Sequence, residues 1–543
     1  MLERILENWL DSASERSYQG PLCQMLAADG HRVLHSTRHH PIEFGKDIIT
    51  VAGDGVPCAF QLKGNPGGRL TLAEFRDIQP QLWQLATQAI VFPGVPNMMH
   101  RSYLVTNGYV EEDVQKSLAE MNAQFARGAP PHPRIELIPR GDLLAMATRL
   151  GVRLWPSGVE SINVLMKLLV YDGRDLFPID LLHDLLLPSL YLEPAQEKAP
   201  SKAEVRRSIT SSAILVSTAL KEFSRQDNFY AVATAWTIFS SYVIAACTRH
   251  GLDYTKEGAP AVDIAKGTIV DSLCALCDEA TGREHYVEGD PFTDFAVYQW
   301  RQQLVRGLLS LLWFWIREND DPDSQHRLAN IEKFLASTAG ETQVWGEAAI
   351  PHLLTRIWHY RAKDEALGLT ELSRLLAYLL IANLGKAEQT PLASPYYSFE
   401  DVLRHTARDF LKPHEDPLER ESFKSTTFFA YPLFEILAAR GIKDACKAIW
   451  PDLTRLNHKQ FNVESPWQYC LWRTDAGMEE TKQLPLTQEW SAVYAQSLST
   501  VCDEVPAALK AQPLVLMLFV ILVPHRATPN VVRFLNREIQ RTT

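Results

Sequence analysis

The hydrophobic pattern of the chain changes near residue 160, and this change limits what the chain can fold into. Before that point, short β-rich runs alternate with runs whose apolar residues recur at helical spacing. After it, strand signals nearly vanish, and long apolar-periodic runs follow one another between short breaks rich in Gly, Pro and Asp. With 543 residues the chain is too long for one hydrophobic core. We therefore expect more than one domain.

The order of predicted elements in residues 1–155 is helix, strand, strand, helix, strand, helix, strand, which is typical of an α/β sandwich. We predict a mixed sheet there. Residues 156–204 are predicted to form a helical connector that ends in a polar linker at 193–204. Residues 205–543 are predicted to form an all-helical array or bundle. The fold class expected is thus multidomain, an α/β domain followed by a large all-α region.

Charge is unevenly distributed along the chain. Residues 1–155 contain 15 Lys/Arg and 16 Asp/Glu, a net charge of −1, so −10 of the total of −11 belongs to residues 156–543. Proteins that grip nucleic acid over a wide surface are usually basic. The helical region is therefore a poor candidate for gripping nucleic acid, whereas the near-neutral first part can hold a local basic groove.

Cysteine content and one apolar stretch bear on the compartment. Eight cysteines in so long a chain do not indicate a disulfide framework, and we expect reduced thiols in a cytoplasmic protein. Residues 228–248 carry no charge over a length that could cross a bilayer, but Asn, Thr, Ser and Tyr interrupt the apolar residues. A buried core helix is the favoured interpretation, and we predict no membrane partner.

The stretch GKDIITVAGDGVPCAFQLKG, residues 45–64, reads as a β-hairpin with Asp54 at its tip. That register places Asp47 opposite Gln61, and directly paired residues project to the same face of a sheet. Lys63 lies two residues beyond Gln61 and shares that face. The sequence therefore predicts that Asp47, Gln61 and Lys63 converge, while a largely apolar face on the other side joins the core.

Such a cluster suits cleavage of a phosphodiester bond. Carboxylate and amide oxygens are suitable ligands for Mg²⁺, and Mn²⁺ is a possible substitute, so Asp47 and Gln61 are candidate metal ligands. Lys63 can orient or deprotonate a water and stabilise the transition state. The plainer alternative is a salt bridge between Asp47 and Lys63 on a solvated sheet face, with Gln61 incidental.

GKD, followed fourteen residues after Asp47 by QLK, resembles the PD-(D/E)xK nuclease superfamily, and in particular its Mrr-like restriction-endonuclease branch, which often has QxK in place of ExK. The likeness extends over about 150 of 543 residues. It includes a helix ending in a glycine (LCQMLAADGHRV), a strand, Asn-Gly turn and helix (SYLVTNGYVEEDV), and a closing strand and helix (RIELIPRGDLL). The resemblance implies a restriction-endonuclease-like fold and catalytic roles for Asp47, Gln61 and Lys63.

The family usually has a metal-binding Glu on its first helix, and here the alignment places Gln19 at that position. Glu15 lies four residues earlier on the same helical face, so either residue could complete the metal site. His39, His40 and Arg69 are predicted to contact nucleic acid; an ordinary exposed loop explains them as well.

The resemblance further implies a Mg²⁺-dependent endonuclease that cuts DNA, within a bacterial antiviral defence effector. The helical region would then respond to a small-molecule trigger or a protein partner, and we expect a homo-oligomer or a hetero-complex. Two alternatives stay open: an RNA-cutting effector, and a helical interaction scaffold whose nuclease-like domain is inactive. No GxxxxGK[ST] phosphate loop occurs, so this sequence does not encode ATP-driven translocation.

Overall fold

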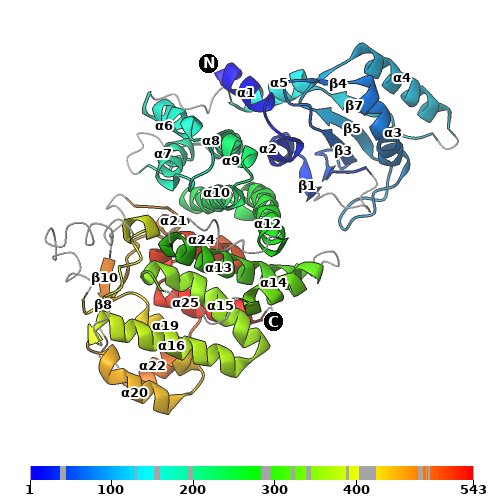
Figure 1. Ribbon diagram of the computed structural model, residues 1–543. Coiled ribbons are helices and arrows are strands. Elements are labelled where there is room, and N and C mark those ends of the chain that lie inside the picture. The colour runs from blue at the N-terminus through cyan, green and yellow to red at the C-terminus, as the bar shows by residue number, and fades with distance from the viewer. Residues whose placement is uncertain are drawn as a thin grey trace. The chain divides into compact units, whose positions relative to one another are not determined.

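The computed structural model of the chain consists of two compact units, Met1–Ser272 and Leu273–Thr543 (Figure 1). The structure describes residues 2–36, 45–128, 131–151, 159–193, 200–282, 295–319, 325–337, 344–386, 390–402, 424–474, 481–484, 486 and 489–541. The α/β sandwich predicted for residues 1–155 forms the beginning of the first unit.

A five-stranded mixed sheet lies at the centre of this sandwich, in the order β1-β2-β3-β5-β7. Its strands are β1 (Arg32–Ser36), β2 (Ile48–Val51), β3 (Pro57–Lys63), β5 (Arg101–Thr106) and β7 (Ile135–Ile138). The first three strands are antiparallel neighbours, whereas β3, β5 and β7 run parallel. A separate parallel pair, β4 (Arg69–Leu70) with β6 (Tyr109–Val110), lies beyond the ends of β3 and β5. The predicted mixed sheet is confirmed.

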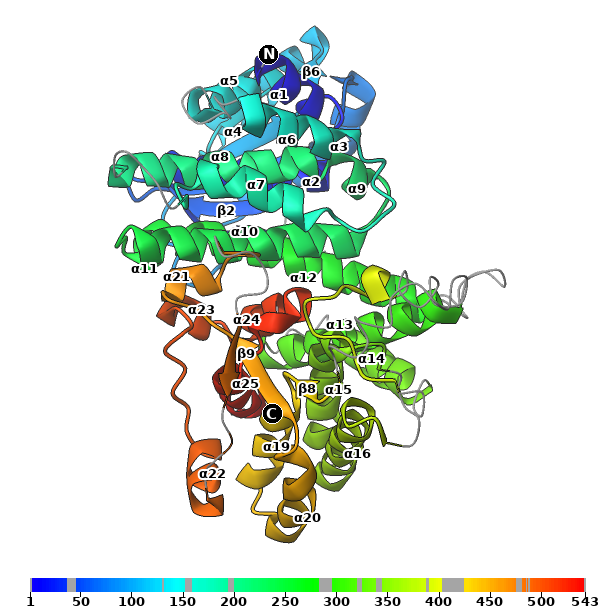
Figure 2. The same ribbon diagram turned by 90° about the vertical axis from the view of Figure 1, so that its left-hand side faces the viewer.

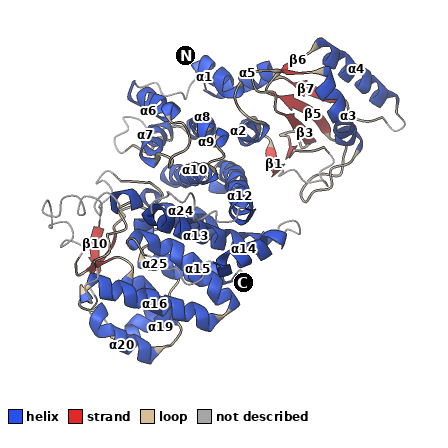
Figure 3. Ribbon diagram, viewed as in Figure 1, coloured by secondary structure: helices blue, strands red, loops and turns tan. Residues whose placement is uncertain are grey.

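Helices cover both faces of this sheet (Figure 3). On one face pack α1 (Leu2–Leu10), α2 (Glu15–Ala28) and α5 (Arg140–Gly151); on the other pack α3 (Leu72–Thr87) and α4 (Glu112–Arg127). Phe60 joins the first core, whereas its neighbour Ala59 joins the second. All four residues of β2 are buried, as expected for a β-branched strand covered on both sides. The alternative interpretation of a solvated sheet face is therefore wrong.

Further helices complete the first unit: α6 (Val159–Val170), α7 (Ile179–Ser189), α8 (Lys202–Ala219), α9 (Lys221–Arg225), α10 (Phe229–Arg249), α11 (Tyr254–Glu257) and the first part of α12 (Ala259–Gly282). Ile214 of α8 belongs to the same core cluster as α2. The buried amide of Gln24 on α2 donates to the carbonyl oxygen of Ala261 at 2.9 Å. The sandwich thus shares its packing with helices that follow it in the sequence.

Among the described residues, α10 is the one helix with the length and apolar content to cross a membrane. However, 89% of its most apolar window is buried inside the structure. This burial confirms the prediction of a core helix for residues 228–248. All eight cysteines are free and buried, which agrees with the expectation of thiols without disulfides.

The second unit is mostly helical. Its helices are the rest of α12, α13 (Phe295–Asn319), α14 (Gln325–Ser337), α15 (Ile350–Lys363), α16 (Glu365–Asn383), α19 (Ala430–Ala439), α20 (Lys443–Leu453), α21 (Pro466–Tyr469), α22 (Trp490–Ser497), α23 (Ala507–Lys510), α24 (Pro513–Leu522) and α25 (Pro529–Arg541), with short 3₁₀ turns at Glu347–Ala349 and Pro524–Arg526. In succession, α13, α15, α16 and α19 pack against one another (Figure 2). The predicted helical region is confirmed.

A small three-stranded sheet interrupts these helices and was not predicted. It consists of β8 (Thr426–Thr427), β9 (Asn457–Phe461) and β10 (Thr481–Leu484), in the order β10-β9-β8. The central strand, NHKQF, is mostly polar. Its only strongly apolar residue is Phe461, so hydrophobic alternation gives no signal there.

Among the described residues of the second unit, two carboxylates are fully buried. Glu435 of α19 accepts two hydrogen bonds of 2.6 Å from the Arg533 guanidinium on α25. Glu347 accepts from the main-chain nitrogens of Phe428 (2.7 Å) and Phe429 (3.0 Å), and from the side-chain amide of Asn383 (2.8 Å). Burial raises the pKa of Glu347 to about 7, although these hydrogen bonds act in the opposite direction. Each carboxylate joins segments that are distant in the sequence.

Candidate active site

The hairpin formed by β2 and β3 has the register expected from the sequence. Ile48 pairs with Phe60 and Ile49 with Ala59, and the main-chain nitrogen of Asp47 donates to the Phe60 carbonyl at 2.8 Å. At the turn, the Asp54 side chain accepts a hydrogen bond of 3.1 Å from the main-chain nitrogen of Val56. Asp47 is therefore held directly before β2, beside the last residues of β3.

Asp47 and Gln61 are in direct contact. The amide nitrogen of Gln61, Nε2, donates to Asp47 Oδ2 at 2.6 Å. The main-chain nitrogen of Leu62 donates to the same oxygen, also at 2.6 Å. Two donors therefore fix this carboxylate at the end of the sheet where β3 finishes.

The amide oxygen of Gln61 is buried and, within the described part of the chain, has no hydrogen-bond partner; the residue is 4% exposed. Gly45 leaves room for it: a Cβ there would lie 3.3 Å from this oxygen and 2.3 Å from the Gln81 carbonyl of α3. Gly45 has φ +74°, a conformation that favours glycine. An unpaired buried acceptor is costly, and a cation or a donor would satisfy it.

Lys63 is the last residue of β3 and pairs with Thr106 of β5. It is half-buried, and strand alternation turns it to the same face as Gln61. No carboxylate among the described residues forms an ion pair with its ammonium group. The salt bridge with Asp47 that the plainer alternative required is therefore not formed, and the ammonium is available to a ligand.

Helix α2 brings both of its predicted residues to this region. It begins after the cap residue Ser14, whose hydroxyl accepts from the main-chain nitrogen of Ser17. The Gln19 amide donates to the Asp47 carbonyl oxygen at 3.5 Å, the long limit for a hydrogen bond. The Glu15 carboxylate accepts from the Gly64 main-chain nitrogen at 3.1 Å. Gln19 thus contacts the backbone of Asp47, and Glu15 contacts the backbone after Lys63.

Of the three residues predicted to contact nucleic acid, the structure describes one. Arg69 is exposed at the start of β4, in the loop that follows Lys63. His39 and His40 are outside the described residues. The role of Arg69 stays a prediction.

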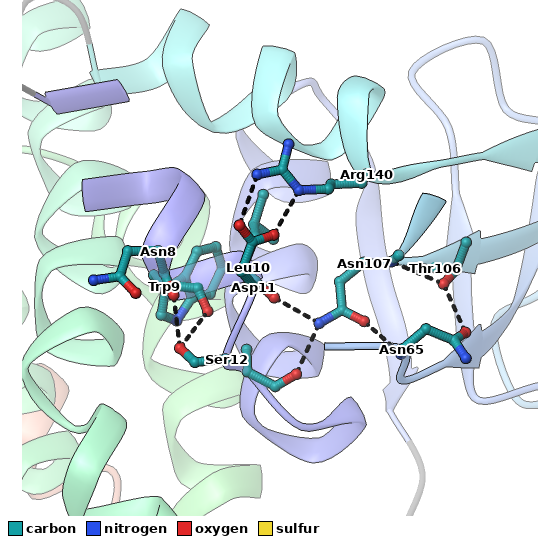
Figure 4. Close-up of polar contacts among 11 residues, drawn as sticks. Asn8, Trp9, Leu10, Asp11, Ser12, Asn65, Thr106, Asn107 and Arg140 are labelled. Carbon is teal, nitrogen blue, oxygen red and sulfur yellow. Dashed lines mark hydrogen bonds and ion pairs between the residues drawn. The ribbon is translucent and has the colours of Figure 1, made fainter. Parts of the chain in front are cut away.

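Asn107, which the sequence marked only as a turn residue, is a fully buried hydrogen-bonding centre (Figure 4). Its amide nitrogen donates to the carbonyl oxygens of Leu10 and Ala13, both at 2.7 Å, and its oxygen accepts from the Asn65 main-chain nitrogen at 2.8 Å. The same view shows Arg140 bound to Asp11 through two hydrogen bonds, of 2.6 and 2.9 Å. The Asn107 contacts tie the α1–α2 connection to the loop after β3, and the Arg140–Asp11 pair ties it to the start of α5.

Lys46 is a second residue that the sequence did not single out. Its side chain is buried, and its ammonium lies 3.4 Å from the Gln84 carbonyl oxygen in the last turn of α3. Burial lowers the pKa of Lys46 to about 8. Carbonyl groups at the C-terminal end of a helix attract a positive charge, so this contact holds Lys46 against α3. Lys46 directly precedes Asp47, and we assign it a structural role.

The donor set fits a divalent cation through one carboxylate and one amide oxygen. The assignment of oxygen and nitrogen in Gln61 follows from its contact with Asp47, and a half-turn of the amide would direct Oε1 to the carboxylate. Two oxygens facing each other there would repel unless a cation bound both of them or the carboxyl group carried a proton. The described residues contain no group of three His, Cys, Asp or Glu side chains arranged to hold a metal. Further ligands would therefore be water or phosphate oxygens.

Comparisons with known proteins give no match. No family model matches the sequence, and no curated protein or solved structure is similar to it at a significant level. The interpretation of the site therefore depends on its own geometry and on the motif resemblance.

Gln61→Glu tests whether Asp47 and Gln61 form a cation site. The substitution replaces the donor to Asp47 with a second carboxylate oxygen at the same contact, so the two negative groups repel. We expect the free energy of unfolding in EDTA to fall by about 1–3 kcal/mol. Added Mg²⁺ or Mn²⁺ should restore this loss, and should raise the melting temperature of the variant more than that of the wild type.

The matched control is Gln115→Glu, the same change of charge at an exposed position of α4. Its melting temperature should respond to Mg²⁺ as the wild type does. If Gln61→Glu were equally destabilised with and without divalent cation, the cation site would be refuted.

Proposed function

We propose that the α/β sandwich is a metal-dependent nuclease that cleaves DNA phosphodiester bonds. The observation that supports this most directly is the 2.6 Å contact between Asp47 and Gln61, beside an unpaired amide oxygen. Lys63, without an ion-pair partner among the described residues, extends from the same strand two residues further on. The proposal thus brings together a carboxylate, an amide and an ammonium group at the end of β3.

Each of these side chains has a distinct task. Asp47 supplies the negative charge, and Gln61 supplies a neutral oxygen ligand for Mg²⁺, with Mn²⁺ as a substitute. When bound, the cation supplies Lewis acidity that activates water and offsets charge on phosphate. Lys63 donates hydrogen bonds to a phosphate oxygen or to the attacking water and stabilises negative charge in the transition state. Because Gln61 is neutral, cation affinity depends strongly on Asp47.

The second unit is proposed to regulate the first. Residues 273–543 contain 28 Lys/Arg and 35 Asp/Glu, a net charge of −7 of the total of −11, so protein or small-molecule contacts suit that unit better than DNA. We propose that it responds to a trigger or a protein partner in an assembly, as the resemblance to defence effectors implies. Free, buried cysteines throughout the chain agree with a cytoplasmic location.

The experiment that tests this function is a cleavage assay with the full-length protein. Linear DNA, supercoiled DNA and RNA are each incubated with Mg²⁺, with Mn²⁺ and with EDTA, and Mn²⁺ binding is measured by calorimetry in parallel. We expect both DNA forms to be cut with Mg²⁺ and left intact with EDTA, and RNA to stay intact. If only RNA were cut, the substrate would be RNA instead of DNA. If the protein binds no Mn²⁺ and cleaves none of the substrates, the result would favour the scaffold hypothesis.

A further inference from the structure

Two side chains of α2 hold the backbone on the two sides of the peptide bond that follows Lys63. The Tyr18 hydroxyl donates to the Lys63 carbonyl oxygen at 3.0 Å, and the Glu15 carboxylate accepts from the Gly64 main-chain nitrogen at 3.1 Å. Tyr18 is buried, and burial raises the pKa of its hydroxyl well above the ordinary value. That hydroxyl therefore remains a donor at any pH at which the protein would work.

The residue after Gly64, Asn65, is held by a third side chain, that of Asn107. The Asn65 main-chain nitrogen donates to Asn107, which is itself fixed to two carbonyl oxygens in the α1–α2 connection (Figure 4). The Asn65 side chain also accepts from the Thr106 hydroxyl at 3.0 Å and donates to Glu74 at 3.2 Å. Three successive residues, the last of β3 and the two that follow it, are thus bound by side chains.

The fit around this segment is tight. A Cβ at Gly64 would lie 2.9 Å from the Glu15 main-chain nitrogen and 3.1 Å from its Cβ. A Cβ at Gly108 would lie 2.6 Å from the Asn65 Cβ. Real Cβ atoms do not approach backbone this closely, so glycine at both positions permits the contacts of Glu15 and Asn65.

We propose that Glu15, Tyr18 and Asn107 are positioning residues that fix the main chain at Lys63, and that Glu15 acts through the Gly64 N–H rather than as a metal ligand. This inference rests on the proposed nuclease function. It gives Glu15 of α2, which the sequence offered as a candidate metal ligand, a role through the main chain instead.

The physical need for such positioning comes from lysine itself. Its ammonium lies on a flexible four-carbon stem, at the end of a strand where the ladder of hydrogen bonds stops. Fixing the carbonyl of Lys63 and the N–H of Gly64 sets the direction in which the side chain leaves the backbone. A misplacement of about 1 Å costs a reaction about 10²-fold in rate. Removing one of these contacts should therefore affect turnover more than cation binding.

The test compares Glu15→Gln with Glu15→Ala. Glutamine keeps an oxygen acceptor for the Gly64 N–H but removes the charge. For a positioning residue, Glu15→Gln retains kcat and Mn²⁺ affinity within about threefold, whereas Glu15→Ala loses about 10²-fold in kcat at unchanged Mn²⁺ affinity. For a metal ligand, both variants lose Mn²⁺ affinity by about tenfold or more. Glu112→Ala, an exposed change at the start of α4, is the control.

A readout independent of activity is hydrogen exchange of the segment containing Gly64 and Asn65. We expect faster exchange in Glu15→Ala, Tyr18→Phe and Asn107→Ala, and wild-type exchange in Glu15→Gln. Unchanged exchange and kcat in Glu15→Ala, or reduced Mn²⁺ affinity in Glu15→Gln, would overturn the positioning role while the nuclease proposal stands. A wild-type protein that neither binds Mn²⁺ nor cleaves would overturn both.

Discussion

Lys63→Met is expected to lower the DNA cleavage rate by about 10²–10³-fold, the usual cost of losing one donor to a developing negative charge. Methionine keeps the apolar stem of the side chain and removes the ammonium. Because Lys63 makes no ion pair with the described residues, the free energy of unfolding should change by less than about 0.5 kcal/mol. Single-turnover kinetics measure the cleavage rate and chemical unfolding measures the stability. Mn²⁺ calorimetry measures cation affinity, which should stay near the wild-type value.

Asp47→Asn, by contrast, should abolish both cleavage and Mn²⁺ binding. The amide removes the charge that Asp47 contributes, and it can place a donor against the Leu62 N–H and the Gln61 amide. Lys116→Met on the exposed face of α4 is the control for loss of a lysine charge, and it should cleave at the wild-type rate. A Lys63→Met protein that cuts DNA as fast as this control would contradict the assignment of Lys63.

The largest expected effect on stability comes from Arg533→Met in the second unit. Arg533 and Glu435 are 4% and 0% exposed, and breaking a buried ion pair by removing one partner costs about 3–5 kcal/mol, because the other charge stays buried and unpaired. The matched control is the double variant Glu435→Leu with Arg533→Met. The double variant leaves no charge at this buried position, so it should regain most of the lost free energy of unfolding. Chemical unfolding followed by tryptophan fluorescence measures both.

The effect of Arg533→Met should also depend on pH. Burial raises the pKa of Glu435, and Arg533 is the main group that opposes this shift. In the variant the carboxyl group therefore binds a proton more readily in the folded state than in the unfolded state. A folded-state pKa above the unfolded value means that stability falls as pH rises through the folded pKa. The loss should be largest above neutral pH and smaller near pH 5; the opposite trend would contradict the account of an unpaired buried carboxylate.

The β2–β3 hairpin shows what local sequence determines. Gly55, with φ +83°, and the Asp54 side chain make the turn, and the turn sets the register that joins Asp47 to Gln61. This contact could be predicted because both residues belong to one short segment with a strong turn signal. The long helices of both units were predictable for a similar reason, since their apolar periodicity is local.

The contacts that hold Lys63 in place could not be predicted. Tyr18 and Asn107 reach the loop after β3 from 45 and 42 residues away, so their roles depend on tertiary packing rather than on local pattern. Asn107 in particular looks like any Asn-Gly turn in the sequence. The small β9 sheet was missed because its polar residues give no alternation, and the partner strands alone define it.

The packing of α2 has a consequence for how the chain could have been assembled. One side of this helix carries Glu15, Tyr18 and Gln19, and Ile214 and Ala261, on α8 and α12, cover α2 elsewhere. A boundary at residue 155 would remove those contacts from the helix that holds the main chain after Lys63. If this sandwich has ever been exchanged between proteins as a cassette, α8 and the start of α12 would have had to move with it.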